Sequence, residues 1–349
     1  MTMRAAVFRG PGELHVEERP VPTVGAGEVL LRVRACAVCG SDLRTLRHGH
    51  SRVAPPRVLG HEIAGEVAAV GEGVTSLSVG DRVSTGADAP CGACSACRSG
   101  APNHCATNLA IGYQWDGGFA DYVVLDQRMV DGGPVATFDA SLPFVDAALA
   151  EPVACCLNGW ERLPASARGH VVILGAGPIG LMLAMVGRAL GRLDTVTFVD
   201  PLAPRRATAA PFADHVVDVP DALDAVLDHT GGRGADVVFT ANSAPSSHPL
   251  AVDLVAIGGA INLFGGLPKG TGPVAIDTNR LHYREAILTG SHGSTPDQHA
   301  RALALIADGT VGAGAVVSET VAVDGLPDAA RRAMTGEALK VVMTAGDAP

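Results

Sequence analysis

Short apolar runs alternate with segments of helical length through the middle of the chain. Residues 171–174 are β-branched and apolar, and residues 181–190 form an alanine-rich apolar segment long enough for a helix. Residues 195–199, 235–240 and 259–264 are further apolar runs that predict buried strands. Because strands that alternate with helices build a doubly wound parallel sheet, we expect an α/β fold here.

The two ends of the chain have a different pattern. Residues 4–8 and 28–33 are short β-type runs, separated by turns rich in glycine and proline. Near the C-terminus, a helix is expected at 296–307 and strands at 316–323 and 338–343. These runs predict a second, mainly β domain to which both ends of the chain contribute.

Two domain boundaries follow from this change of pattern. We expect residues 1–146 and 288–349 to form the mainly β domain, and residues 147–287 to form the domain with the parallel sheet. A helix expected at 147–163 would lead from the first domain into the second. The chain of 349 residues is long enough for each domain to bury its own core.

A glycine-rich turn joins the first strand of the parallel sheet to its helix. Gly175, Gly177 and Gly180 fit the pattern G-x-G-x-x-G, with Pro178 and Ile179 between the last two glycines. The first glycine allows a tight turn, the second lets a pyrophosphate approach the backbone, and the third lets helix and strand pack closely. Its position between a predicted strand and helix favours a dinucleotide site over an ordinary turn.

The next predicted strand ends in an acidic residue. Asp200 follows Gly180 by twenty residues, where a carboxylate can hold the ribose hydroxyls of the adenosine half of NAD. A carboxylate there also repels the 2′-phosphate of NADP. We therefore expect NAD, although Arg205 and Arg206 lie close behind and weaken the preference; Arg205 is a further candidate contact of the cofactor.

Composition narrows the choice of partners. The chain is 47% hydrophobic and 18% charged, and its formal net charge is -10, which argues against a nucleic-acid groove or a polybasic membrane surface. The sequence contains no run of about twenty apolar residues, and its first residues lead into a strand instead of a signal sequence. We expect a cytoplasmic protein that acts on a small molecule.

Four of the eight cysteines are clustered. Cys91, Cys94, Cys97 and Cys105 have the spacing of a zinc site, and four thiolates complete a tetrahedral shell with no open position. Such a site is structural, since no ligand position remains for a substrate. Disulfides are the alternative, but they are rare in the expected compartment.

A second set of metal-ligand residues lies earlier in the chain. Cys39 and His61 supply the thiolate and imidazole that zinc takes in catalytic sites, where one position stays open for water or substrate. Glu62 and Glu151 are both candidates for the third ligand, and the sequence leaves that choice open.

Around His61 the chain resembles a known family. Gly60-His61-Glu62, Gly65, Gly71 and Val74 fit the signature G-H-E-x2-G-x5-G-x2-V of the zinc-containing alcohol dehydrogenases in the medium-chain dehydrogenase/reductase superfamily. The segment 116–122, D-G-G-F-A-D-Y, is similar to another motif of this family, and the resemblance extends over essentially the whole chain. It implies a Rossmann domain for the cofactor and a GroES-like β domain with a structural zinc lobe.

The resemblance is strongest to the sorbitol and polyol dehydrogenase branch. There the cysteine and the His-Glu pair bind the catalytic zinc, and a glutamate in an E-P motif, here Glu151, lies beside the zinc-bound water. Other alcohol dehydrogenases have a cysteine near that point, which makes Cys155 and Cys156 rival ligands, although both also suit a buried helix.

The resemblance also assigns roles near the zinc. It implies that the Ser41 hydroxyl passes the alcohol proton toward solvent, and Asp42 would fix the ring of His61. Many relatives complete the relay with a histidine five residues after the cysteine, where this chain has Arg44. Tyr113 and Trp115 are either cleft residues or ordinary packed aromatics.

Several basic residues surround Arg44. This basic cluster could meet a substrate phosphate, but a solvated surface is the preferred interpretation. Its members are Arg44, Arg47, His48, His50 and Arg52.

Together these features predict a zinc-dependent, NAD-linked oxidation of a secondary alcohol to a ketone, or the reverse reduction. The resemblance implies a polyol, sugar or cyclitol as substrate, amino-bearing ones included, and a homodimer or homotetramer. Alternatives are a polyol-phosphate dehydrogenase, a zinc-free quinone or enoyl reductase of the same superfamily, and a protein that uses the fold without catalysis.

Overall fold

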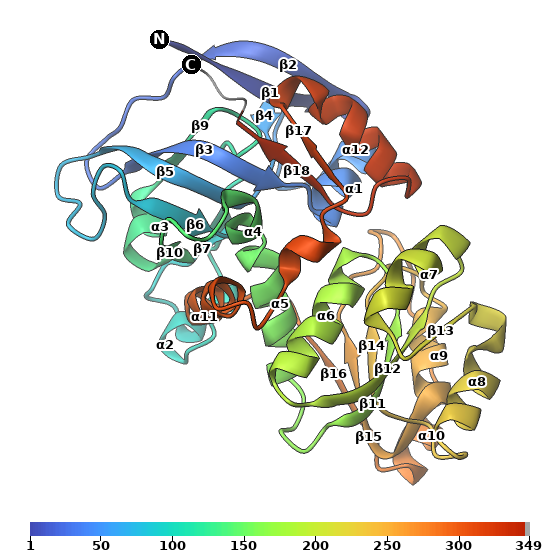
Figure 1. The fold of residues 1–349 in the computed structure, drawn as a ribbon. Coiled ribbons are helices and arrows are strands. Elements are labelled where there is room, and N and C mark those ends of the chain that lie inside the picture. The colour runs from blue at the N-terminus through green and yellow to red at the C-terminus, as the bar shows by residue number, and fades with distance from the viewer. Residues whose placement is uncertain (346–349) are drawn as a thin grey trace. The chain divides into compact units, whose positions relative to one another are not determined.

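The computed structural model describes residues 1–345 of the chain, and these form two compact units (Figure 1). The first unit contains residues 1–154 together with the segment from Gly293 onward, and the second is Cys155–His292. No helix among the described residues is long and apolar enough to cross a membrane.

The second unit contains the expected doubly wound sheet, so the predicted fold class is confirmed. Its strands are all parallel and lie in the order β13-β12-β11-β14-β15-β16 (Figure 1). The strands are β11 (Gly169–Leu174), β12 (Leu193–Val199), β13 (His215–Val217), β14 (Ala235–Thr240), β15 (Val255–Leu263) and β16 (Ile287–Gly290).

Helices pack on both faces of this sheet because side chains alternate along each strand. On one face, Val172 of β11 belongs to an apolar cluster with residues of α8 and α9. On the other, Ile173 approaches the start of α6, and Trp160 of α5 packs on Phe239 of β14 at 4.8 Å between ring centroids. The helices are α5 (Ala150–Glu161), α6 (Pro178–Ala189), α7 (Ala203–Ala209), α8 (Ala222–His229), α9 (Ser247–Leu254) and α10 (Thr278–Tyr283).

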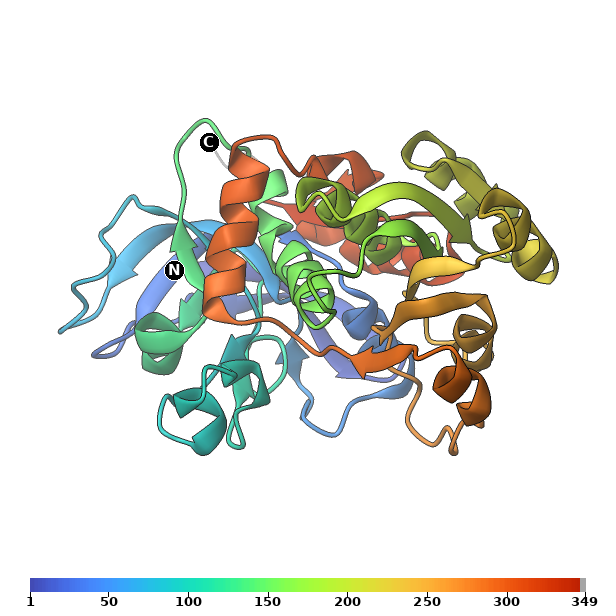
Figure 2. The same cartoon turned by 90° about the horizontal axis from the view of Figure 1, so that it is seen from below.

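The structure differs from the sequence expectation where the chain changes units. The helix expected at 147–163 is two helices, α4 (Phe144–Ala148) and α5, with Leu149 between them. The expected boundary at 287/288 falls inside β16, whose hydrogen bonds to β15 keep it in the parallel sheet. Figure 2 shows the chain leaving β16 in an extended segment that leads to α11.

The first unit is mainly β, as expected. Its largest sheet has the strand order β10-β6-β5-β3-β18-β17, with β9 also paired to β3. Smaller sheets are β2-β1-β4 and β7-β8. The strands are β1 (Thr2–Gly10), β2 (Glu13–Pro20), β3 (Val29–Ala37), β4 (Arg57–Val58), β5 (Glu62–Val70), β6 (Arg82–Thr85), β7 (Asp88–Ala89), β8 (Leu109–Ala110), β9 (Tyr122–Leu125), β10 (Val135–Thr137), β17 (Glu319–Val321) and β18 (Val341–Thr344).

Strand β18 brings residues 341–344 into the same sheet as β3 from the N-terminal part of the chain. It pairs antiparallel with β3, with Val342 opposite Ala37 and Met343 opposite Cys36 (Figure 1). The helices of this unit are α1 (Gly40–His48), α2 (Ser95–Arg98), α3 (Gln127–Gly132), α4, α11 (Pro296–Ala307) and α12 (Leu326–Thr335). Short 3₁₀ turns in the first unit are Pro102–His104, Ala313–Val316 and Val323–Gly325, and those in the second unit are Ala210–Phe212 and Val219–Asp221.

One buried histidine ties three elements of the first unit together. His299 of α11 is fully buried, and its Nε2 lies 3.2 Å from Oγ of Ser84 on β6. The Ser84 hydroxyl donates to the carbonyl of Ala147 on α4 at 2.8 Å. Burial lowers the pKa of His299 to about 4, because a charged imidazolium is poorly solvated there.

This lowered pKa predicts acid sensitivity. Between the ordinary value of 6.5 and about 4, the unfolded chain binds a proton that folded His299 does not, so stability falls as pH falls through this window. We expect His299→Gln to remove up to about 3 kcal/mol of that loss between pH 7 and pH 4, as measured by urea unfolding. His15→Gln, at an exposed position on β2, is the control. Identical pH slopes for wild type and His299→Gln would contradict the assignment.

Candidate metal and cofactor sites

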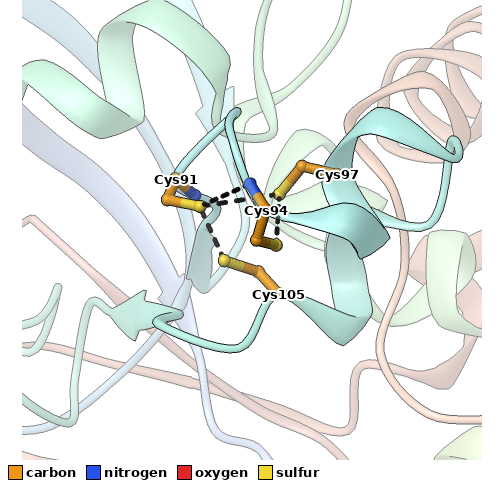
Figure 3. A group of neighbouring side chains, drawn as sticks. All are labelled: Cys91, Cys94, Cys97 and Cys105. Carbon is orange, nitrogen blue, oxygen red and sulfur yellow. Dashed lines mark hydrogen bonds between the residues drawn. The ribbon is translucent and has the colours of Figure 1, made fainter.

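Four cysteines converge in a small lobe of the first unit (Figure 3). Cys91 follows β7, Cys94 precedes α2, Cys97 lies within α2, and Cys105 follows the 3₁₀ turn at Pro102–His104. Their Sγ atoms all lie within 4.8 Å of one another. All eight cysteines lie in the described part of the chain and none forms a disulfide, so the disulfide alternative is not the arrangement found here.

The backbone of this lobe stabilises thiolates. The amide of Cys94 donates to Sγ of Cys91 at 3.3 Å, and the amide of Cys91 donates to Sγ of Cys105 at 3.2 Å. Amide donors from Ala93 and Cys94 lower the pKa of Cys91 to about 5, whereas burial and the neighbouring Cys94 raise that of Cys97 to about 11. Four sulfur donors at these separations fit a closed tetrahedral zinc site.

The second donor group lies where β3, α1 and β5 meet. Cys39 precedes α1, His61 precedes β5, and Glu62 is the first residue of β5. Their ligand atoms also lie within 4.8 Å of one another. Glu62 is completely buried and His61 nearly so, while Cys39 is partly exposed. A thiolate, an imidazole and a carboxylate leave a fourth position open on zinc, as a catalytic site requires.

Asp42 holds the histidine of this group. Its Oδ1 lies 3.3 Å from Nδ1 of His61, an ion-pair contact that leaves Nε2 for a ligand. The same carboxylate accepts from the amide of Cys39 at 3.0 Å and from that of Gly60 at 3.3 Å. Burial is the largest influence and lowers the pKa of His61, but Asp42, Tyr113 and Cys39 together outweigh it and raise the pKa well above its usual value. Asp42 therefore has the position that the sequence predicts.

Glu62 is paired with Lys340, which lies 278 residues later in the chain. Nζ of Lys340 lies 2.5 Å from its Oε2 and donates to the carbonyl of Val38 at 3.0 Å. Oε1 of Glu62 is buried and has no hydrogen-bond partner among the described residues. An unpaired carboxylate oxygen beside a thiol and an imidazole fits a metal ion, since a buried acceptor without a partner is otherwise costly.

The other candidate ligands lie outside this group. Glu151, in the first turn of α5, is close enough to interact electrostatically with His61 and Glu62, and desolvation raises its pKa to about 7. Among the described residues, the donor group of Cys39 and His61 includes Glu62 and neither Glu151, Cys155 nor Cys156. Cys156 instead lies 3.8 Å from the carbonyl of Ile179 and packs as a buried side chain.

The predicted relay residue is next to His61. Oγ of Ser41 lies 3.4 Å from Nε2 of His61. The ring of Tyr113 is 5.6 Å from that of His61, whereas Trp115 packs against the core of the unit. The proximity of Tyr113 to His61 is not evident from the sequence, because no motif spacing links the two residues.

Much of the basic cluster is exposed to solvent. Arg44, Arg47 and His48 are exposed on α1. Arg52 donates to the carbonyl of Asn108 at 3.2 Å and to Oε1 of Gln114 at 3.3 Å. Asp116 pairs with Arg57 at 3.1 Å, so it stabilises the loop.

In the second unit, the glycine-rich loop has the geometry that the motif predicts. Gly175 has φ +118°, a conformation that favours glycine. A Cβ at Gly180 would lie 2.1 Å from the carbonyl oxygen of Gly175, so only glycine fits this tight turn. Gly177 caps α6 and Pro178 is its first residue, which leaves the helix N-terminus suited to a phosphate.

Asp200 lies against this loop. Its Oδ2 accepts from the amide of Ala176 at 2.9 Å and its Oδ1 from that of Leu202 at 2.9 Å. The guanidinium of Arg205 reaches the loop, with Nη1 2.7 Å from where a Cβ of Gly177 would be. Arg206 instead pairs with Asp218 at 3.2 Å. The loop, the acid and one arginine together form a cradle that fits a dinucleotide.

Comparisons with known proteins agree with the two domain types. Residues 25–132 match the alcohol dehydrogenase GroES-like domain and residues 178–308 match the zinc-binding dehydrogenase family. A sorbitol dehydrogenase from Halalkalibacterium halodurans is 33% identical over 340 residues, which cover 96% of each chain. An L-threonine 3-dehydrogenase from Pyrococcus abyssi is 36% identical over 285 residues, 79% of each chain.

A solved structure gives the same result for the fold. The crystal structure of a zinc-binding dehydrogenase from Sinorhizobium meliloti 1021, bound to NADP, superposes with a TM-score of 0.89 at 31% identity and covers 99% of each chain. The family expected from the sequence is thereby confirmed. The chain belongs to the zinc-containing medium-chain dehydrogenase/reductase superfamily, in its polyol dehydrogenase branch.

Proposed function

We propose that this chain is a zinc-dependent dehydrogenase that uses NAD to oxidise a secondary alcohol of a polyol, sugar or cyclitol to a ketone, or catalyses the reverse reduction. The observation that carries the proposal is the convergence of Cys39, His61 and Glu62, with a buried Glu62 oxygen that has no hydrogen-bond partner in the described part of the chain. This donor set argues against a zinc-free reductase or a non-catalytic use of the fold. Glu62 is the proposed third ligand.

The residues around the metal have separate tasks in this proposal. When bound by Cys39, His61 and Glu62, zinc supplies Lewis-acid chemistry that favours the ionised form of an alcohol. Ser41, beside His61, would take the alcohol proton while passing its own hydroxyl proton toward solvent, and Asp42 keeps the imidazole in place. Glu151, with a pKa of about 7, can take up or release a proton near neutral pH.

The cofactor site supports NAD as the hydride acceptor. The cofactor supplies the redox chemistry, and the chain binds and orients it. The glycine loop and the N-terminus of α6 would hold the pyrophosphate, and Asp200 the adenosine ribose. Arg205 would contact the phosphates or the ribose. The carboxylate of Asp200 would repel a 2′-phosphate, which favours NAD over NADP.

The sorbitol and L-threonine relatives both point to a secondary alcohol with a neighbouring polar group. The exposed positions of Arg44, Arg47 and His48 favour an unphosphorylated substrate over a polyol phosphate. We further propose a cytoplasmic enzyme, which agrees with eight cysteines that form no disulfide among the described residues.

We also propose a homodimer or homotetramer. Strand β16 is an edge of the parallel sheet, and Ile287 and Leu288 on it are 43% and 38% exposed. Exposed apolar edge strands favour pairing with another chain. The apolar run at 261–264 is not such an edge, because β15, which contains most of it, lies inside the sheet between β14 and β16.

The reaction is tested by following NAD reduction with neutral polyols, polyol phosphates, aminocyclitols and L-threonine. We expect turnover with an unphosphorylated secondary alcohol, and a loss of at least about 1,000-fold in kcat/KM for Cys39→Ala and His61→Ala, because both remove a metal ligand. Cys155→Ala is the matched control and should retain activity. Retained activity in the Cys39 and His61 variants would exclude the proposed metal centre.

The cofactor preference depends on the charge of Asp200. Asp200→Asn should lower kcat/KM for NAD about tenfold and leave or raise that for NADP, since the repulsion of a 2′-phosphate is removed. Steady-state kinetics with both cofactors measures the ratio. Asp194→Asn, exposed on β12, should leave the ratio unchanged. An unchanged ratio in Asp200→Asn would contradict this role.

Lys340 should matter for stability as well as for the metal site. Lys340→Met leaves the Glu62 carboxylate buried without its ion-pair partner, so we expect urea unfolding of the metal-depleted protein to show a loss of about 3–5 kcal/mol. Adding Glu62→Gln should restore much of it. Lys269→Met replaces an exposed lysine and should change stability by less than about 0.5 kcal/mol. Equal effects of the two lysine variants would refute the argument.

A further inference from the structure

One side chain of the second unit joins the segment after β14 to the start of the glycine-rich turn. Asn242 lies two residues beyond the end of β14, and its Nδ2 donates to the carbonyl of Leu174 at 2.8 Å. The amide of Ala241 donates to the same carbonyl at 2.8 Å. A carbonyl oxygen has two lone pairs, so both are used here. Because Leu174 immediately precedes Gly175, these two donors fix β11 at the point where the turn begins.

The oxygen of the Asn242 side chain is held as well. Oδ1 accepts from the amide of Ala244 at 2.8 Å and from the hydroxyl of Ser247 at 2.8 Å. Ser247 is buried and is the first residue of α9. Since a carboxamide donates only from its nitrogen and accepts mainly at its oxygen, these contacts favour one orientation of the side chain. In the reversed orientation, Oδ1 would face the carbonyl oxygen of Leu174.

The turn packs closely against the backbone beside Asn242. A Cβ at Gly175 would lie 2.8 Å from the carbonyl oxygen of Ala241 and 3.3 Å from Cβ of Asn242. From the direction of β12, the amide of Gly175 donates to the carbonyl of Val199 at 2.8 Å. The turn is therefore held between the end of β12 and the segment after β14, and a displacement of Asn242 would be passed on to Gly175.

We propose that Asn242 is a positioning residue for the nicotinamide cofactor, which holds the Leu174 carbonyl and so keeps the glycine-rich turn in the conformation that receives the pyrophosphate. This inference rests on the cofactor site of the proposed function. It requires no contact between Asn242 and the cofactor. A turn that already has its binding conformation loses less conformational freedom when the ligand binds, and this strengthens the affinity.

Loss of this side chain would leave the sheet itself paired. Leu174 and Thr240 remain opposite each other in the ladder of β11 and β14, and the amide of Ala241 still donates to Leu174. The contacts that disappear are those that link the turn to the start of α9. We therefore expect an effect on cofactor affinity beyond any loss of stability.

The test is a double-mutant cycle on the Kd for NADH, measured by fluorescence titration of the full chain, so no turnover is needed. We expect Asn242→Ala to raise Kd about tenfold, because the side chain that braces the turn is removed. Ser247→Ala should raise Kd about threefold by itself and have no further effect once residue 242 is Ala, since the serine acts through the asparagine.

Thr230→Val is the matched control in the same unit. Thr230 is buried, and its hydroxyl donates to the carbonyl of Val226 at 2.6 Å and accepts from the amide of Gly234 at 3.0 Å, just before β14 begins. This variant should lower the urea midpoint, as Asn242→Ala does, yet leave the Kd for NADH unchanged. An equal rise in Kd for both variants would reflect a general loss of stability and overturn the inference.

Two other results would also overturn it. One is a Kd in Asn242→Ala equal to that of the wild type, and the other is additive effects of the two substitutions on the free energy of NADH binding. If Asn242→Ala does not fold, Ser247→Ala decides alone, and an unchanged Kd in that variant rejects the inference. A wild type that binds neither NADH nor NADPH would instead contradict the cofactor site of the proposed function.

Discussion

The ion pair between Glu62 and Lys340 is the interaction on which the first unit and its donor group both depend. Glu62 opens β5 and Lys340 precedes β18, so the pair joins the two strands that flank β3 in the largest sheet. Both side chains are almost fully buried. Two buried charges are stable only when each is paired and hydrogen-bonded, and one Glu62 oxygen has no hydrogen-bond partner among residues 1–345. A cation held by Cys39, His61 and Glu62 would satisfy that oxygen.

The same principle organises the rest of the site. Charged or polar groups that would be costly alone are arranged so that each restrains another, as Asp42 restrains His61. The ligand atoms of Cys39, His61 and Glu62 lie within 4.8 Å of one another, and a metal held by these three residues would keep one position open. In the second unit, the proposed cofactor site consists mainly of backbone amides and one carboxylate.

The sequence predicts those parts of the molecule that depend on local spacing. The four-cysteine lobe and the glycine turn are each encoded within a short segment, and both fold as expected. The contact of Lys340 with Glu62 could not be predicted in this way, because the two residues are 278 positions apart. A single lysine next to a strand gives no recognisable sequence pattern. Helix α12 is absent from the expectation because much of its buried face is alanine, which gives a weak apolar pattern.

The zinc content of the purified protein tests the central claim most directly. If Cys39, His61 and Glu62 bind a catalytic zinc and the four cysteines bind a structural one, wild type should contain about two zinc ions per chain and Cys39→Ser about one. Plasma mass spectrometry on protein dialysed against a weak chelator gives both numbers. Equal zinc content in the two proteins would contradict the account, as would a single zinc ion in the wild type.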